Sequence, residues 1–204
     1  MKKNLIIGLT GGIACGKTTV ARLFQNFGAD VIDADSVGHR LLREDLSVKK
    51  KLVATFGASI LDSKNEIDRL KLGRIVFNSP DQLQALNKIV HPLIIERIKA
   101  DVAKKSSSAG KSIIVIDAAL LLELDLKYVV DFVVLVYADE NIQMQRLTQR
   151  GLSYEDARRR IKSQMPSHEK TRFADFVIYN NGSLSNTAKQ AEEVWRALTK
   201  LLDP

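Results

Sequence analysis

The chain has 204 residues, of which 45% are hydrophobic, enough to bury the core of one domain with an inserted subdomain. Lysine and arginine outnumber aspartate and glutamate by 31 to 24. The resulting net charge of +7 favours anionic ligands such as nucleotides, phosphorylated metabolites or nucleic acid. Cys15 is the only cysteine, so an intrachain disulfide is excluded and nothing indicates an oxidising compartment.

The basic start before the apolar LIIGL at residues 5–9 resembles part of a secretion signal, with Cys15 in a setting vaguely like a lipoprotein cleavage site. Gly8, Gly11 and Gly12 interrupt that apolar stretch, and no other segment approaches the roughly 18 to 20 apolar residues that span a membrane. We therefore expect a cytoplasmic protein without a membrane partner.

Five short segments rich in valine and isoleucine have the length of strands and are mostly apolar on both faces, as in a parallel sheet covered by helices. They span residues 4–9, 30–33, 112–117, 131–137 and 175–179. An apolar stripe from Val20 to Phe27 predicts a first helix that ends near Gly28. A similar stripe from Ala188 to Leu202 predicts a C-terminal helix that serves packing.

Two insertions interrupt this alternation of strands and helices. Residues 34–104 read as helices with an interruption in TFGASILDSKNEID (55–68) and a break at Asn78-Ser79-Pro80, so we expect a helical subdomain. KKSSSAGKS (104–112) predicts a solvated loop that returns to the sheet. A second, basic insertion covers residues 150–172. The nucleotide-binding core would then comprise residues 1–33 and 105–204.

The stretch Gly11–Thr18 reads GGIACGKT and satisfies G-x-x-x-x-G-K-[ST] between a predicted strand and a predicted helix. Glycines let such a loop point its backbone N–H groups at phosphate oxygens, and the helix dipole adds positive potential. Lys17 would bridge the β- and γ-phosphates, and the Thr18 hydroxyl would ligate Mg²⁺. The motif therefore predicts a site for a nucleoside triphosphate.

Two aspartates end predicted strands at the carboxyl edge of the sheet, where the phosphate loop also lies. Asp33, which ends a strand expected beside the loop strand, could hold or deprotonate an attacking hydroxyl. It could instead cap the next helix, although Asp35 or Ser36 is the better candidate for that cap. Asp117 resembles a Walker B carboxylate that steadies the Mg²⁺ shell, and its alternative is an ordinary turn residue.

The basic insertion predicts a lid whose guanidinium groups stabilise charge on the transferring phosphoryl group and exclude water. Arg146 and Arg150, on or just after the helix that follows the fourth strand, are the leading candidates. Arg158, Arg159 and Arg160 cannot all face inward, because consecutive helical residues are about 100° apart.

These segments together resemble the dephospho-CoA kinase family, which catalyses the last step of coenzyme A biosynthesis, and the resemblance runs nearly end to end. GLTGGIACGKTTVA (8–21) is similar to the family's phosphate loop and VIDAD (31–35) to its Asp-Ala-Asp segment. The remaining matches are RLKLGRIVF (69–77) with IVHPLI (89–94), DAALLLE (117–123), QRLTQRG (145–151) with EDARRRIKSQ (155–164), and ADFVIYNNGS (174–183).

The sequence departs from the family pattern at three positions. Ala14 and Cys15 stand where the family usually has glycine and serine, and Ala119 stands where it has proline. The first two keep small side chains and every backbone N–H, and the third makes the local chain less rigid. None removes a charged or proton-transferring group, so activity should survive.

The resemblance implies an α/β, three-layer P-loop kinase fold with a parallel five-stranded sheet, a helical substrate-binding insertion and a lid. It implies transfer of the γ-phosphoryl group of ATP, with Mg²⁺, to the ribose 3′-hydroxyl of dephospho-CoA. In the acceptor-binding insertion, Arg69 and His91 match family motifs, although His91 before Pro92 could simply cap or pack a helix end. His39 and His168 receive no role. The residues that would cradle ATP are Gly11, Gly12, Ile13, Ala14, Cys15, Gly16, Lys17, Thr18 and Thr19.

Three other functions share some of these features. A kinase of another small metabolite would share the loop, the acid and the lid, and only the insertion motifs argue against it. A nucleic-acid-binding ATPase would suit the positive charge, but no such motif is present and aromatic residues make up only 6%. A GTPase would need an aspartate that NKIV (87–90) lacks. We therefore expect no nucleic-acid partner, and a monomer, with an oligomer as the alternative.

Cys15 leaves two interpretations open. A thiol just before a helix N-terminus and two residues from Lys17 lies in a positive field, which favours the reactive thiolate. Alternatively, the sulfur points into the protein and Cys15 is a small, inert substitute for serine.

Overall fold

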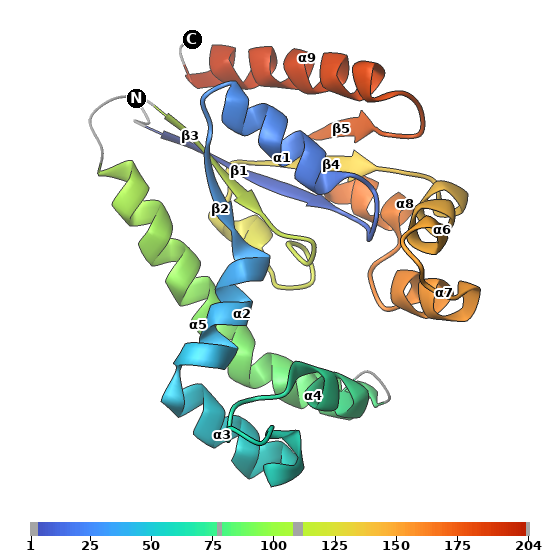
Figure 1. The fold of residues 1–204 in the computed structure, drawn as a ribbon. Helices are drawn as coiled ribbons and strands as arrows, with labels where there is room; N and C mark the ends of the chain where they lie inside the picture. The colour runs from blue at the N-terminus through green and yellow to red at the C-terminus, as the bar shows by residue number, and fades with distance from the viewer. Residues whose placement is uncertain (1–3, 77–78, 108–111, 203–204) are drawn as a thin grey trace. The chain divides into compact units, whose positions relative to one another are not determined.

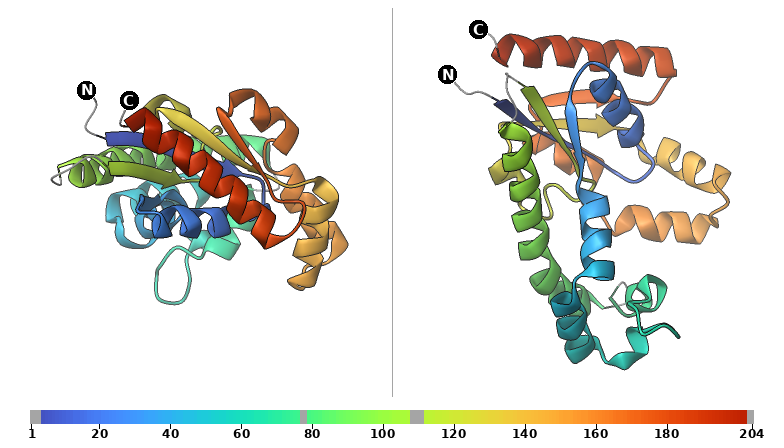
Figure 2. Two further views of the ribbon diagram at one scale, coloured as in Figure 1. Left: turned by 90° about the horizontal axis from the view of Figure 1, so that it is seen from above. Right: turned by 60° about the vertical axis from the view of Figure 1, so that its left-hand side comes forward.

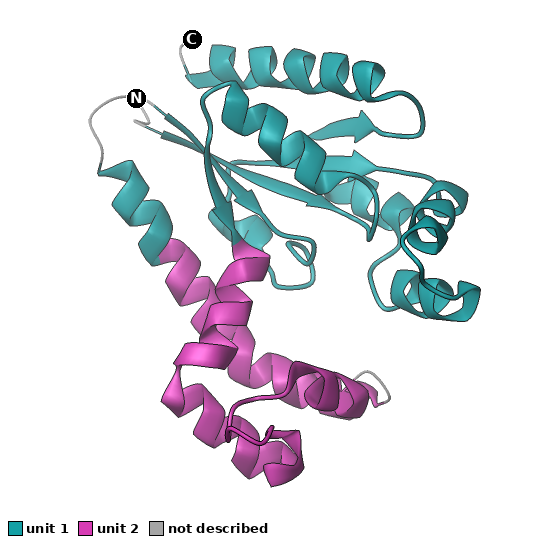
Figure 3. Cartoon of the chain, in the orientation of Figure 1, with its two compact units in different colours: residues 1–33, 100–204 teal, residues 34–99 magenta. Residues whose placement is uncertain are grey.

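The structure is a computed structural model that describes residues 4–76, 79–107 and 112–202. The chain is divided into two compact units, coloured separately in Figure 3. Unit 1 comprises Met1–Asp33 and Ala100–Pro204, and unit 2 comprises Ala34–Lys99. The boundary near residue 100 falls inside a continuous helix rather than in a loop, because helix α5 runs from Pro80 to Ser106.

Unit 1 is built around a sheet of five parallel strands in the order β2-β3-β1-β4-β5 (Figure 1). The predicted strands are confirmed to within two residues at either end, and their type of pairing is as expected. The strands are β1 (Asn4–Gly11), β2 (Asp30–Asp33), β3 (Ser112–Asp117), β4 (Phe132–Tyr137) and β5 (Phe176–Tyr179).

Helices α1 and α9 lie side by side over one face of this sheet (Figure 2). Their apolar stripes bury Val20, Phe24 and Leu198 against the strands, and Trp195 packs its ring 5.9 Å from that of Phe24. The first helix ends at Asn26, two residues before the glycine expected to end it. The helices of unit 1 besides the end of α5 are α1 (Lys17–Asn26), α6 (Glu140–Gln149), α7 (Tyr154–Lys162), α8 (Ser167–Lys170) and α9 (Leu184–Leu202), with 3-10 turns η2 (Leu126–Val129) and η3 (Thr171–Phe173).

The opposite face of β1 packs against the segment that follows β3. Gly8 points to this face, and a Cβ there would lie only 2.7 Å from Leu121 Cδ1, so the close approach requires glycine. Asp131 and Asp175, expected as first strand residues, instead precede β4 and β5. Each carboxylate accepts a hydrogen bond from a backbone N–H of the neighbouring strand, that of Ile6 at 3.0 Å and that of Val133 at 2.7 Å.

Unit 2 is helical, as its sequence predicted. Helix α3 begins after Asp45, whose carboxylate accepts hydrogen bonds from the N–H groups of Ser47 and Val48. The interruption expected at residues 55–68 contains a short 3-10 turn and an isolated bridge between Leu61 and Ile67. The elements are α2 (Ala34–Glu44), α3 (Leu46–Phe56), η1 (Ala58–Ile60), α4 (Arg69–Val76) and most of α5 (Pro80–Ser106).

Parts of two predicted breaks lie outside the described residues, namely Asn78 before α5 and residues 108–111 of the expected loop after it. Within the described ranges, no helix is both long and apolar enough to cross a membrane.

Candidate active site

The phosphate loop follows β1 and leads directly into α1, which begins at Lys17. Two of its residues have left-handed backbone conformations, Ala14 with φ 59° and Gly16 with φ 98°. A Cβ on Gly16 would lie 2.1 Å from Asn180 Nδ2, so both conformation and packing require glycine there. Ala14 adopts this conformation with a Cβ, which costs about 1 kcal/mol and explains why glycine is the usual residue.

Two side chains from outside the loop hold its carbonyl oxygens. Arg146 of α6 donates to Ala14 O at 3.1 Å, to Cys15 O at 3.3 Å and to Asn180 O at 2.8 Å. Asn180, just after β5, donates from Nδ2 to Cys15 O at 2.7 Å, and Thr187 donates to its Oδ1 at 2.8 Å. These contacts orient the peptide groups of the loop. Contact of Arg146 with a transferring phosphoryl group, which we expected, stays a prediction that would require these bonds to change.

Lys17 forms an ion pair with Asp117, which ends β3. Both side chains are largely buried, and Asp117 is 8% exposed. Because β1 and β3 are adjacent and Leu9 pairs with Asp117, this carboxylate lies at the carboxyl edge of the sheet next to the loop. The pair therefore joins the loop lysine to the strand-end acid that the sequence singled out.

Asp33 ends β2 at the same edge, in register with Asp117 on β3. The expectation that its strand lies beside the loop strand is wrong, because β3 lies between β2 and β1. Asp33 is exposed, and α2 begins at the next residue. The expected cap at Asp35 or Ser36 is therefore also wrong, since both residues lie within the first turn of α2.

The donor set beside the loop suits Mg²⁺. Thr18 is exposed on the first turn of α1, and Asp117 supplies a carboxylate, so both are oxygen ligands of the kind that Mg²⁺ prefers. Among the described residues, no three His, Cys, Asp or Glu side chains gather as a metal site. A Mg²⁺ held by one or two protein oxygens together with substrate phosphates needs no such cluster.

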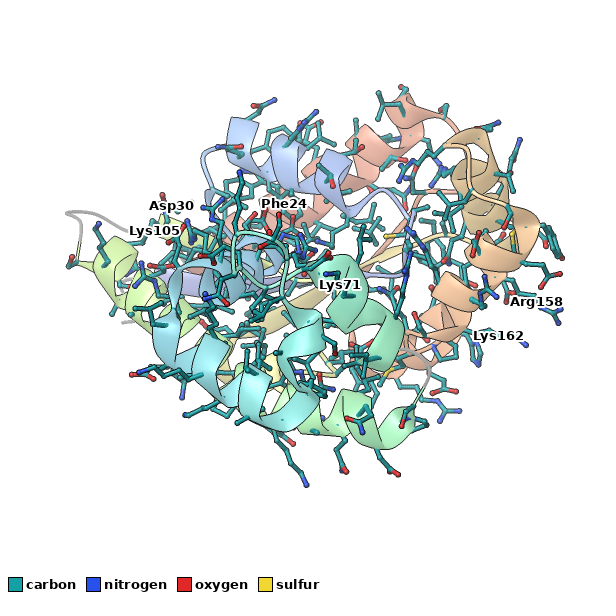
Figure 4. The ribbon with its side chains drawn as sticks, turned by 60° about the horizontal axis from the view of Figure 1, so that its bottom comes forward. Phe24, Asp30, Lys71, Lys105, Arg158 and Lys162 are labelled. Carbon is teal, nitrogen blue, oxygen red and sulfur yellow. The ribbon has the colours of Figure 1, made fainter. Side chains whose placement is uncertain are left out.

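The predicted lid contains α7, α8 and η3. Arg150 is exposed at the C-terminal end of α6, and Arg158, Arg159 and Arg160 of α7 are all exposed. Arg158 and Lys162 project outward from α7 (Figure 4). Lys170 differs from these cations because its side chain is fully buried. Most charged side chains of the predicted lid are therefore exposed to solvent, whereas the ammonium group of Lys170 is buried within unit 1.

A cavity of about 280 Å³ lies between the phosphate loop and the base of the lid. Gly12 lines it from the loop, Gln143 from α6, and Ile161, Gln164 and His168 from the lid. His168, to which the sequence assigned no role, thus borders the same space as the loop. A Cβ on Gly12 would lie 3.0 Å from both Gln143 Oε1 and Ser167 Oγ, which places α6 and α8 directly against the loop.

Cys15 points into the protein, with 1% of its surface exposed. Burial raises the pKa of its thiol to about 11, and the opposing effect of Lys17 is smaller. The hypothesis of an exposed, reactive thiolate is therefore wrong, and Cys15 acts as a small buried side chain.

Unit 2 carries the two residues expected to contact the acceptor. Arg69, at the start of α4, places Nη2 2.6 Å from Nε2 of His39 on α2. His91 lies in the middle of α5 before Pro92, so the alternative that it caps a helix end is wrong. His39 received no role from the sequence, and its contact with Arg69 could not be foreseen because the two residues lie on different helices.

Sequence reasoning also missed Asn180 and Gln164 as residues of the site. Asn180 binds the carbonyl of Cys15, and Gln164 Oε1 accepts a hydrogen bond from Ile13 N at 2.8 Å. Both occur in segments that the family resemblance had already marked, EDARRRIKSQ and ADFVIYNNGS. The resemblance was therefore the available signal, but it did not indicate which atoms meet.

A parallel sheet with a braced phosphate loop, a paired loop lysine and a basic lid defines the protein as a P-loop kinase. The comparisons with known proteins narrow this class. The family model described as dephospho-CoA kinase matches residues 5–186. A dephospho-CoA kinase of Geobacillus kaustophilus is 43% identical over 201 residues, which cover 97% of this chain and 100% of that protein.

Solved structures agree. A protein from Thermus thermophilus superposes with a TM-score of 0.81 at 31% identity, covering 96% of this chain and 97% of that one. A dephospho-CoA kinase from Campylobacter jejuni gives a TM-score of 0.69 at 28% identity, with 97% and 98% covered. The chain therefore belongs to the dephospho-CoA kinase family, and it is a phosphotransferase.

Proposed function

We propose that the protein transfers the γ-phosphoryl group of ATP to the ribose 3′-hydroxyl of dephospho-CoA, giving coenzyme A and ADP. The observation that carries this proposal is the alignment of three functional groups on adjacent strands. Lys17 follows β1, Asp117 ends β3, and Asp33 ends β2 in register with Asp117. A phosphate held by the loop therefore has a cation and two carboxylates along one edge of the sheet.

In this proposal the residues Gly11–Thr19 bind the phosphates of ATP. The backbone N–H groups supply fixed donors, and their orientation is supported by the bonds from Arg146 and Asn180 to the carbonyls of the loop. Lys17 exchanges part of its contact with Asp117 for phosphate oxygens and stabilises charge on the transferring group.

Asp33 acts on the acceptor. Its exposed carboxylate would hold the 3′-hydroxyl and accept its proton as the oxygen attacks the γ-phosphorus. Thr18 and Asp117 would hold Mg²⁺, which when bound neutralises phosphate charge and orients the nucleotide. Arg69 and His91 in unit 2 would contact the acceptor, and the guanidinium groups of Arg146 and Arg150 would stabilise the transferring phosphoryl group.

The remaining parts of the proposal concern the setting of the reaction. The protein would work as a cytoplasmic monomer, with residues 150–172 closing over bound nucleotide and with no nucleic-acid partner. The alternative within the same class is a kinase of another small hydroxylated metabolite, which would use the same loop and the same acid.

An acceptor panel distinguishes these two functions. With ATP and Mg²⁺, kcat/KM is measured for dephospho-CoA, adenosine, AMP and unrelated hydroxylated metabolites. We expect a preference for dephospho-CoA of at least about 10²-fold, the scale on which several lost contacts discriminate between substrates. Equal or better turnover of another acceptor would assign the activity to that metabolite instead.

A further inference from the structure

The buried ammonium group of Lys170 is not used by the proposed reaction. Lys170 has no exposed surface, and it contacts two groups of the segment that follows β3. Its Nζ donates to Ala119 O at 2.8 Å and lies 3.0 Å from Glu123 Oε1. A buried ammonium is costly unless it is paired, so these partners determine where the base of the lid lies.

Glu123 extends this contact toward the phosphate loop. Its Oε1 also accepts a hydrogen bond from the backbone N–H of Met165, at 3.1 Å. The residue before Met165 is Gln164, whose Oε1 accepts from the N–H of Ile13 at 2.8 Å. Fixing the peptide at Met165 therefore fixes the side chain that reaches the loop.

The contacts return to the strand from which the loop begins. Thr10 Oγ1 donates to Ala119 O at 3.3 Å, the same carbonyl that Lys170 contacts. Hydrogen bonds thus link Thr10 and Lys170 to Ala119 O, and Lys170 and Met165 N to Glu123. The covalent bond from Met165 to Gln164 continues this path, and the Gln164 side chain reaches Ile13. The path joins the residue before the loop to a residue within it.

We propose that Glu123, Lys170 and Gln164 are positioning residues that hold the phosphate loop in its nucleotide-binding shape before ATP arrives. The Glu123–Lys170 pair fixes the base of the lid, and Gln164 carries that constraint to Ile13. A loop held in this way loses less conformational freedom when it binds phosphate, which strengthens ATP binding. The carboxylate and the ammonium act through Gln164 and touch no substrate.

This inference rests on the proposed use of the loop for ATP, and it has a physical rival. The oxygen of Gln164 could instead compete with phosphate for the Ile13 N–H and weaken ATP binding. The two possibilities predict opposite effects of the same substitution. If Gln164 positions the loop, Gln164→Leu raises Kd for ATP, and if it competes, the substitution lowers Kd.

The test uses two variants of the full chain, their combination and one matched control. Gln164→Leu removes the last contact, and Glu123→Leu with Lys170→Met replaces the buried pair by apolar groups of similar size, a change that proteins often tolerate. The control is Asp30→Asn with Lys105→Met, which removes a 2.8 Å ion pair at the start of β2, the opposite edge from the loop (Figure 4).

The double variant Glu123→Leu with Lys170→Met is called the paired variant below. For it and for Gln164→Leu we expect Kd and KM for ATP to rise about tenfold, with KM for the acceptor unchanged. Exchange of the Ile13 amide, followed by NMR, should become about tenfold faster in both. Adding Gln164→Leu to the paired variant should change Kd for ATP and Ile13 exchange little further, because the contact between Gln164 and Ile13 is already lost. The control should stay within about threefold of the parent protein.

Unchanged Ile13 exchange and unchanged Kd for ATP in folded variants would overturn the proposal, and tighter ATP binding by Gln164→Leu would establish competition instead. If the paired variant fails to fold, native-state exchange of the parent protein gives the answer, because Ile13 and Met165 should then open with equal free energies. Unequal opening would also overturn it. A parent protein that binds no ATP would refute the proposed function itself, which separates the two failures.

Discussion

The phosphate loop and the lid helix α7 carry their positive charge in different ways. The loop uses backbone N–H groups and one lysine, all held by contacts such as Arg146 with Ala14 O and Lys17 with Asp117. Helix α7 presents Arg158, Arg159 and Arg160 on exposed side chains. A site that must bind phosphate before the reaction is best preorganised, whereas charge that acts only after closure can remain solvated until then. Under the proposed function, the loop would therefore determine ATP binding, and residues 150–172 would act later.

The largest effect should come from Asp33, the acid at the end of β2, rather than from either basic region. Asp33→Asn keeps the shape of the side chain and removes its ability to accept a proton. We expect kcat to fall by about 10²- to 10⁴-fold, the usual contribution of a general base. Kd for ATP should not change, and equilibrium titration with ATP checks this. Near-normal turnover would leave Asp33 with only a structural role at the end of β2.

Lys17→Ala tests the preorganised charge of the loop. It removes the cation that we propose acts on the transferring group, so kcat should fall by about 10²- to 10³-fold, or roughly 3–4 kcal/mol of transition-state stabilisation. Steady-state kinetics gives the loss, and thermal unfolding shows whether the buried carboxylate of Asp117 remains tolerated without its partner. A loss of activity matched by a loss of folded protein would mean that Lys17 acts mainly on stability.

The reactivity of the Cys15 thiol tests whether its side chain is buried beneath the phosphate loop. With a pKa near 11 against an ordinary value of 9.0, the thiolate fraction at pH 8 should be about a hundredfold smaller than for a free thiol. Iodoacetamide should therefore label Cys15 slowly in the folded protein and rapidly in urea. Rapid labelling of the folded protein, slowed by ATP, would restore the hypothesis of a reactive thiolate.

The same shift has a consequence for stability. Because the folded protein holds this proton more tightly than the unfolded chain does, the stabilisation is complete below about pH 9 and is lost as pH rises toward 11. Cys15→Ser should lack this part of the alkaline decline, which denaturant unfolding at several pH values measures. A variant with the same alkaline decline as the parent would exclude the thiol as its source.

For the lid, residues 150–172, we expect a change when ligands bind. ATP together with an acceptor should slow amide exchange in α7 (Tyr154–Lys162) by about tenfold, while α9 should exchange as before. Hydrogen exchange read by mass spectrometry provides both values in one experiment. If α7 exchanges at the same rate with and without ligands, residues 150–172 do not act as a lid.

The smallest effect concerns strain in the loop. Ala14→Gly should relieve the left-handed conformation of Ala14 and stabilise the protein by up to about 1 kcal/mol, less the entropy that glycine adds to the unfolded chain. The matched control is Ala103→Gly, exposed within α5, which should destabilise by about 0.5–1 kcal/mol. If both substitutions destabilise the protein, strain at Ala14 is not significant.

The sequence predicted the strands and the phosphate loop well, because both depend on local patterns of apolar residues and glycine. It did not predict that β3 lies between β1 and β2, since strand order depends on contacts between segments far apart along the chain. Nor did it predict the burial of Lys170, because a four-residue helix has too little periodicity to reveal a buried face. The partners of Arg146 and Gln164 in the phosphate loop lie more than 130 residues away along the chain, beyond the reach of any local pattern.

The central claim is tested most directly by product analysis. The protein is incubated with ATP, Mg²⁺ and dephospho-CoA, and the products are separated and examined by phosphorus NMR. We expect coenzyme A and ADP in equal amounts, with the new phosphomonoester on the ribose 3′ oxygen and no reaction after removal of Mg²⁺. ADP that forms equally fast without dephospho-CoA, or a phosphate on another oxygen, would contradict the account.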